Sequence, residues 1–325
     1  MSAKETGGLP PRGRAAATTR AAIASVAVAL LLLSLKGWAT FATGSVAMLG
    51  SLIDSGLDVI ASLVTLWAVR IAAAPADHDH RFGHGKAEAL AALFQVGLIA
   101  VSAAGIFWRA ADRLISGEVS AAAEYGIGVS LAAIAATLAL TAYQRRIIRQ
   151  TGSVAIAADH VHYQSDLLLN GAVIAALMIE QYGGLAGADP LFGLAIALWL
   201  AWGGWRASRS AVNQLMDREW PEERRRAFLA ATAHPANRGT HDLRTRSSGA
   251  DDFAQFHIRV DPAMTVVEAH RVMDEIEERL SAEFPGVEVL IHVDPLGQVD
   301  APGNALVETD EARLGTSAAI ETRSG

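Results

Sequence analysis

The stretch that decides the fold is SVAMLGSLIDSGLDVIASLVTLWAV, residues 45–69. It is apolar and exceeds the roughly 20 residues that a helix needs to span a bilayer, yet it contains Asp54 and Asp58. Their i, i+4 spacing places both carboxylates on one helix face. A charge at bilayer depth costs several kcal/mol and is normally kept for function. The stretch therefore predicts a membrane helix with functional carboxylates.

Five further apolar segments complete a set of six candidate spans. The spans are 19–40, 44–73, 87–110, 122–144, 154–180 and 190–208. Arginine and lysine crowd the flanks on one side, whereas the opposite flanks hold only Arg109 and Arg113. Because positive residues favour the cytoplasmic side, we expect both termini in the cytoplasm. The first span is long enough to be retained as a helix and not cleaved as a signal peptide.

The chain changes character after the sixth span. Residues 213–298 are mixed in polarity and read as helix, strand, strand, helix and strand. The fold class predicted is an α-helical membrane protein with six transmembrane helices, followed by a small αββαβ domain. We expect residues 1–18 to form an N-terminal tail, residues 19–212 the membrane domain, and residues 299–325 a disordered acidic tail.

Composition excludes several functions. The chain has 325 residues, of which 51% are hydrophobic, and no cysteine. Disulfides and thiolate metal sites are thereby excluded, and no basic patch interleaved with aromatics suggests nucleic acid. Any metal must be held by oxygen and imidazole, which disfavours Cu(I) and leaves zinc, iron, manganese, cobalt or cadmium.

A second pair of polar residues lies within the fifth predicted span. His162 and Asp166 lie in AADHVHYQSDLLLNGAVIAALMI, residues 157–179, again at i, i+4 spacing. At 1.5 Å per residue, both pairs fall near the bilayer midplane, and antiparallel packing would place Asp54 beside Asp166 and Asp58 beside His162. Three carboxylates and one imidazole suit a divalent cation such as zinc. Without it they repel unless they hold protons, so we expect cation transport by proton antiport.

Several motifs resemble the cation diffusion facilitator family, in its bacterial zinc and ferrous-iron efflux branch. They are DSGLD (54–58), PADHDHRFGHGKAEALAAL (75–93), HYQSD (162–166), HDLRTRSSG (241–249) and IHVDP (291–295). The resemblance extends from the first span to about residue 297. It implies a homodimeric secondary transporter in the bacterial inner membrane, with a metallochaperone-like domain that binds metal and dimerises.

The resemblance also implies roles for individual residues. It assigns zinc, or Fe(II), Cd(II) or Co(II), to a transport site, a loop site and a binuclear cytoplasmic site, with protons as the counter-ion. The transport site would comprise Asp54, Asp58, His162 and Asp166; the loop site Asp77, His80 and His84; the cytoplasmic site His241, His257, His270, His292 and Asp294. Asp294 would be the bridging carboxylate, and Lys86 and Asp217 would form a salt bridge near the dimer interface.

Alternatives remain from the residues alone. An intramembrane aspartyl protease needs two carboxylates on different helices and leaves the histidines unexplained. A metal sensor or scaffold without transport, and metal uptake in place of export, would use the same residues. His78, His160 and His234 have no role in the family pattern, and the physiological metal stays open.

Overall fold

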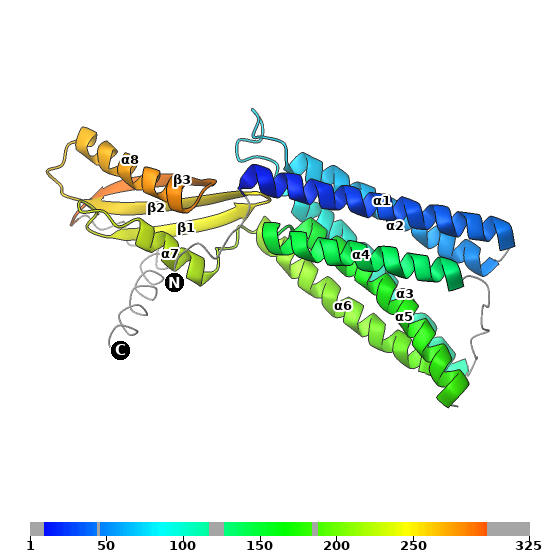
Figure 1. Cartoon of the computed structure of the whole chain (residues 1–325). Helices are drawn as coiled ribbons and strands as arrows, with labels where there is room; N and C mark the ends of the chain where they lie inside the picture. The colour runs from blue at the N-terminus through cyan, green and yellow to red at the C-terminus, as the bar shows by residue number, and fades with distance from the viewer. Residues whose placement is uncertain (1–9, 44–45, 117–126, 184–187, 298–325) are drawn as a thin grey trace. The chain divides into compact units, whose positions relative to one another are not determined.

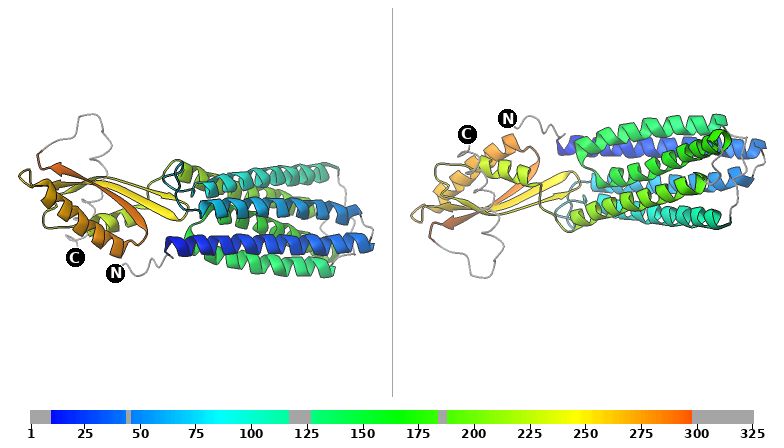
Figure 2. Two further views of the ribbon diagram at one scale, coloured as in Figure 1. Left: turned by 90° about the horizontal axis from the view of Figure 1, so that it is seen from above. Right: turned by 90° about the horizontal axis from the view of Figure 1, so that it is seen from below.

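The computed structural model describes residues 10–43, 46–116, 127–183 and 188–297. The described chain divides into two compact units, one of which spans Arg12–Leu215 and the other follows from Met216. The first unit consists of six long helices (Figure 1): α1 (Pro11–Thr43), α2 (Val46–Ala72), α3 (Ala87–Ser116), α4 (Ile127–Thr151), α5 (Val154–Gly183) and α6 (Ala188–Leu215). They lie side by side as a bundle (Figure 2). The predicted acidic tail lies outside the described residues.

The six helices form the membrane region of a helical membrane protein, as the sequence predicted. Among the described residues, Pro11–Ala42, Leu52–Ala72 and Ala87–Ser116 are long and apolar enough to cross a membrane by length and composition. The apolar face of α2 points outward, with Ile53, Leu57 and Ile60 exposed. Such a face is stable in lipid, which is as apolar as the side chains themselves.

Helix α1 begins at Pro11, earlier than the predicted start at residue 19. Its first residues, PRGRAAATTR, are too polar to register as a span. Alanine and arginine nevertheless favour helix, and proline is favoured in a first helical turn because it lacks only an N–H that would be unpaired there.

The junction between α4 and α5 sets where α5 begins. Gly152 has φ +68, a left-handed conformation that suits glycine, and its N–H donates to the Ile148 carbonyl at 2.8 Å. Ser153 follows directly, and its hydroxyl accepts a hydrogen bond from the Ile156 N–H at 3.3 Å. The same hydroxyl donates to the buried carboxylate of Glu88 on α3. Helix α5, which carries HYQSD, is thus anchored at its first turn to α3.

Small residues bring α6 close to its neighbours. A Cβ at Gly203 would lie 3.0 Å from Cγ1 of Val161 on α5, and one at Gly204 would lie 3.2 Å from Cγ2 of Ile99 on α3. Glycine at these positions lets the helix backbones approach closely, as is common between membrane helices.

The second unit has the predicted αββαβ order. It contains α7 (Glu222–Ala231), β1 (Thr240–Ser248), β2 (Asp251–Val260), α8 (Val266–Glu283) and β3 (Val287–Pro295). The sheet order is β1-β2-β3, with β1 antiparallel and β3 parallel to β2. Helix α8 begins with a capping box in which the Thr265 hydroxyl accepts from the Glu268 N–H and the Glu268 carboxylate accepts from the Thr265 N–H.

Both helices of this unit pack on one face of the sheet. The shared core contains Phe228 of α7, Ile276 and Leu280 of α8, and Phe256 and Ile258 of β2. Side chains alternate between faces along a strand, so His257 lies between two core residues and points to the other face. The sheet therefore has a covered face and an open face, and the histidines of the strands belong to the open one.

Candidate metal centres

The first candidate centre joins α2 and α5 within the helix bundle. Nε2 of His162 lies 2.8 Å from Oδ1 of Asp58 and 3.9 Å from Oδ2 of Asp166. One ligand atom from each of the three residues can be chosen so that all lie within 4.8 Å of one another. Asp58 is thus beside His162, as the matched depths predicted.

Asp54 lies one turn before Asp58 on α2 and is exposed. It is not among the three residues whose ligand atoms converge, although its charge acts on Asp166. Asp54 stays a predicted ligand.

The spacing of this cluster suits a divalent ion. Tetrahedral zinc holds oxygen and nitrogen at 2.0–2.2 Å, so that ligand atoms are about 3.3 Å apart. The separations of 2.8 and 3.9 Å fall on either side of that value. Asp58 and His162 have side chains only 14% and 10% exposed, against 35% for Asp166, so the cluster is half-buried and open toward Asp166.

The second cluster lies in the loop between α2 and α3. Asp77 Oδ1 is 3.1 Å from Nδ1 of His80, and Asp77 Oδ2 is 3.2 Å from Nε2 of His84. The His80 N–H donates to Asp77 at 2.6 Å, and this backbone hydrogen bond lowers the pKa of the carboxyl below its ordinary value. The convergent group contains Asp77, His80 and His84 but not the neighbouring His78.

The third cluster is a row of histidines across the open face of the sheet. The strand register pairs His241 of β1 with His257 of β2, and His257 with His292 of β3. Their rings are neighbours, with centroids 5.1 Å apart for His241 and His257 and 4.6 Å apart for His257 and His292. Asp294 follows His292 by two residues and shares its face.

Asp294 uses its two oxygens on different histidines. Oδ2 lies 3.2 Å from Nε2 of His241 and 2.9 Å from Nδ1 of His257. Oδ1 lies 3.2 Å from Nε2 of His292. A carboxylate so placed suits a bridge between two ions, which is the part the family resemblance assigns to Asp294.

His270 does not join this cluster within one chain. It lies on α8, with Nε2 3.8 Å from Asp274 on the same helix. Because α8 packs on the covered face of the sheet, the sheet separates His270 from the histidines of the open face. Within one chain, His270 thus lies apart from the other four residues of the predicted cytoplasmic site. The five-residue site stays a prediction.

The sequence reasoning missed Asp242. A β-bulge lies between His241 and Arg244, and Asp242 within it adopts φ +51, a conformation that non-glycine residues rarely adopt. Arg244 donates two hydrogen bonds to its carboxylate, at 2.9 and 3.0 Å, and Asp242 Oδ2 lies 3.6 Å from Nε2 of His257. Each nitrogen of His257 thus faces a carboxylate. The only signal in the sequence was an acid next to His241.

The remaining predicted residues have other surroundings. Nζ of Lys86 donates to the Leu215 carbonyl at 3.2 Å, and Asp217 lies 3.7 Å from Arg246. Lys86 and Asp217 belong to different units, so their ion pair stays a prediction. His234 accepts from the Ala236 N–H through Nδ1 and contacts Glu275 at 2.8 Å through Nε2.

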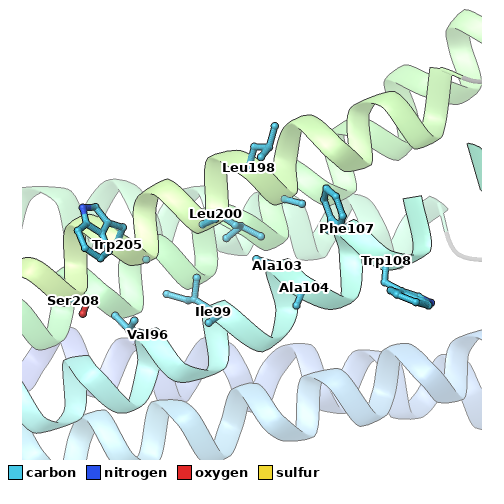
Figure 3. A pocket seen from close by; sticks show the side chains of 14 residues that line it. Val96, Ile99, Ala103, Ala104, Phe107, Trp108, Leu198, Leu200, Trp205 and Ser208 are labelled. Carbon is cyan, nitrogen blue, oxygen red and sulfur yellow. The ribbon is translucent and has the colours of Figure 1, made fainter. Parts of the chain in front are cut away.

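A groove between α3 and α6 is unsuited to a cation. It has a volume of about 610 Å³, and the residues lining it include Ile99, Phe107, Trp108, Leu200 and Trp205 (Figure 3). None of the fourteen lining residues is a carboxylate or an imidazole. The groove therefore lacks the ligands that the three clusters supply.

Six long helices followed by an αββαβ domain define a multi-pass membrane protein with a cytoplasmic domain. A family model described as the cation efflux transmembrane domain matches residues 22–216, and one described as the cation efflux protein cytoplasmic domain matches residues 221–296. The chain therefore belongs to the cation efflux family. It is a transporter and not an enzyme, so an intramembrane aspartyl protease is excluded.

Relatives resemble the chain over most of its length. It is 43% identical to the cation-efflux pump FieF of Cronobacter sakazakii over 86% of this chain and 94% of that protein. It is 42% identical to the pump of the same name from Escherichia fergusonii over 88% and 95%. The solved metal-bound C-terminal domain of the CzcD transporter from Thermotoga maritima is 28% identical, covering 25% of this chain and 99% of that one, with a TM-score of 0.23.

Proposed function

We propose that the chain exports a divalent cation, with zinc as the best match, from the cytoplasm in exchange for protons. The observation that carries the proposal is the convergence of His162 with Asp58 and Asp166 between two membrane helices. Nitrogen and oxygen ligands suit zinc and also Fe(II), Co(II) and Cd(II). Midplane sites are expected for the substrate of an alternating-access transporter.

The same contacts support proton exchange. The 2.8 Å contact between His162 Nε2 and Asp58 is a hydrogen bond, and such a bond between an imidazole nitrogen and a carboxylate holds a proton. A metal ion binds only the deprotonated nitrogen and carboxylates. Cation entry therefore displaces the proton held between His162 and Asp58, and cation release lets it return.

Orientation follows from the charges at the helix ends. The end at which α5 begins carries Arg70, Arg81, Lys86, Arg145, Arg146, Arg149, Arg206 and Arg209, whereas the other end carries Lys36, Arg109 and Arg113. Positive flanks favour the cytoplasm, so the first of these ends is the cytoplasmic one, in a bacterial inner membrane. The relatives are named as cation-efflux pumps. Export of the cation fits a metal-ligating domain on the cytoplasmic side.

The chain works as a homodimer. The third cluster, made of His241, His257, His292 and Asp294, is called the cytoplasmic cluster here and serves as a regulatory metal site. Its ligands come from three strands and converge only in the folded domain, so bound metal stabilises that fold. Substituting His257 should change the metal dependence of transport without abolishing binding at the membrane cluster. Unchanged metal dependence would remove the regulatory role.

Reconstituted vesicles test the transport proposal. Zinc added to proteoliposomes that contain the full chain should drive zinc flux with a counterflow of protons, followed by an internal pH dye. Asp58→Ala should abolish both, whereas Asp112→Ala, an exposed acid on α3, should keep both. Zinc binding without flux in the native chain would favour a sensor or scaffold, and flux only toward the cytoplasm would favour uptake.

A further inference from the structure

The carboxylate of Asp159 is fully buried in the helix bundle, three residues before His162 on α5. The Ser25 hydroxyl donates to it at 2.6 Å, and the side-chain amides of Gln144 and Gln95 donate at 2.8 and 3.0 Å. These partners are neutral donors. A buried carboxylate without a positive partner is costly, so its retention calls for a role beyond packing.

Hydrogen bonds through Asp159 join five helices. Ser25 lies on α1, Gln95 on α3 and Gln144 on α4, and Gln95 also donates to Thr65 of α2 at 3.2 Å. Tyr163, one turn after Asp159, donates to the Ser25 carbonyl at 3.1 Å, and its hydroxyl lies 2.9 Å from that of Ser62 on α2. We call this set the polar layer: Ser25, Ser62, Thr65, Gln95, Gln144, Asp159 and Tyr163.

The polar layer seals one side of the metal cluster. Each of its members is at most 1% exposed. Along α5, exposure rises from 0% at Asp159 to 10% for the side chain of His162 and 35% for that of Asp166. On α2, which runs the opposite way, Ser62 and Thr65 likewise follow Asp58 toward the end where α5 begins. The cluster is thus covered on the side of Asp159 and more exposed on the side of Asp166.

We propose that the polar layer is the inner gate of the transport path and that Asp159 is the positioning residue that holds it shut. This inference rests on the proposed function, because a gate matters only if a cation passes. The cation coming from the cytoplasm must part α1–α5 at this level to reach His162. Asp159 acts by fixing the helices and is not a ligand in this state.

A polar gate can open more readily than an apolar one. Its hydrogen bonds can be replaced by bonds to water as the helices separate, at a modest net cost for each bond. Within the described chain, Oε1 of Gln95 is buried without a hydrogen-bond partner, and such an atom favours the hydrated, open state. The polar layer is therefore closed in this structure but can open at a modest cost in free energy.

An acceptor-only side chain is needed at the centre. Three donors converge on Asp159, and a carboxylate has only acceptors to offer them. Asparagine has the same shape, but its NH2 group would replace one of the two accepting oxygens and would face the donors on that side. Asp159→Asn should therefore weaken the inner gate with almost no change in volume, while Asp58, His162 and Asp166 are untouched.

Labelling of a single cysteine tests the gate. The chain has no cysteine of its own, so Ser62→Cys supplies one reporter at the edge of the layer. In inside-out vesicles, a membrane-impermeant maleimide should label it slowly with Asp159 present. Asp159→Asn should speed labelling at least about fivefold, the factor expected for losing one hydrogen bond. Thr141→Val, which changes a buried threonine of α4 outside the layer, should not.

Two companion measurements keep the outcomes distinct. Equilibrium zinc binding to Asp159→Asn in detergent should stay within about threefold of the native value, since a gate shifts access and is no ligand. Unchanged labelling with binding retained would overturn the gate, as would lost binding with labelling still slow. If Asp159→Asn fails to fold, Ser25→Ala removes one donor and should accelerate labelling in its place. Labelling needs no flux, so failure of the gate is separable from failure of transport.

Discussion

Replacing Asp294 with asparagine should greatly lower the zinc affinity of the cytoplasmic cluster while leaving the fold intact. One carboxylate there lies 2.9–3.2 Å from nitrogens of His241, His257 and His292. Asparagine keeps one acceptor oxygen but loses the charge and the second oxygen. Loss of a group that merely supports a metal ligand costs 10–100-fold in affinity, so loss of this carboxylate should cost at least about 100-fold.

That factor converts into a thermal shift. Zinc at 100 times the native Kd stabilises the folded domain by about 2.7 kcal/mol, whereas the same zinc at a 100-fold weaker site stabilises it by only about 0.4 kcal/mol. The difference is about 2.3 kcal/mol. For a domain of this size, 1 kcal/mol corresponds to about 4–8 °C in Tm, so the zinc-induced rise in Tm should shrink by roughly 10–18 °C.

The assay uses the full chain carrying Asp58→Ala, so that the membrane cluster does not contribute. Isothermal titration gives the zinc affinity, and thermal unfolding with and without zinc gives the shift. Asp274→Asn, an exposed acid beside His270 on α8, is the matched control and should change neither. Native zinc affinity in Asp294→Asn would refute the assignment of this carboxylate as the centre of the cluster.

Three other predictions follow from local geometry. Asp242→Asn should lower the zinc affinity of the cytoplasmic cluster about 10–100-fold by titration, because it faces the second nitrogen of His257; equal affinity would show that Asp242 does not orient the ring. The hydrogen bond from the Thr265 N–H lowers the pKa of Glu268 below its ordinary value of 4.5. The Glu268 carboxylate therefore contributes fully to folding stability above pH 4.5, and this contribution is lost as the pH falls through the lowered pKa. Glu268→Gln should flatten the stability of the domain across that acidic window, and unaltered pH dependence of unfolding would contradict this. Gly204→Leu should lower the free energy of unfolding by about 1–3 kcal/mol, because the added side chain would overpack against Ile99. A melting curve like that of the native chain would contradict the close approach of α6 to α3.

Hydropathy and periodicity identified the six helices and the αββαβ order, but not where helices begin. The start of α1 at Pro11 depends on intrinsic helix preference in a polar stretch. A search for apolar runs ignores such preference. Depth along the helices was more informative, since the rise per residue together with antiparallel packing predicted that Asp58 lies beside His162.

The site residues that the sequence could not place depend on which face of an element they occupy. His270 follows the family pattern, yet α8 covers the face opposite to His257, and no spacing along the chain reveals that. Asp242 became visible only through the β-bulge that turns it toward His257. No pattern in the sequence reveals that Asp159 is buried between five helices, and only the packing shows it.

Zinc flux through His162→Ala, compared with His160→Ala, tests whether the cluster between α2 and α5 is the transport site. The two histidines are two residues apart on α5, but His162 lies against Asp58 whereas His160 lies 3.3 Å from Gln144. In proteoliposomes loaded with a zinc-sensitive dye, His162→Ala should abolish zinc flux and its proton counterflow, and His160→Ala should retain most of both. Native flux in His162→Ala would contradict the assignment of this cluster as the transport site.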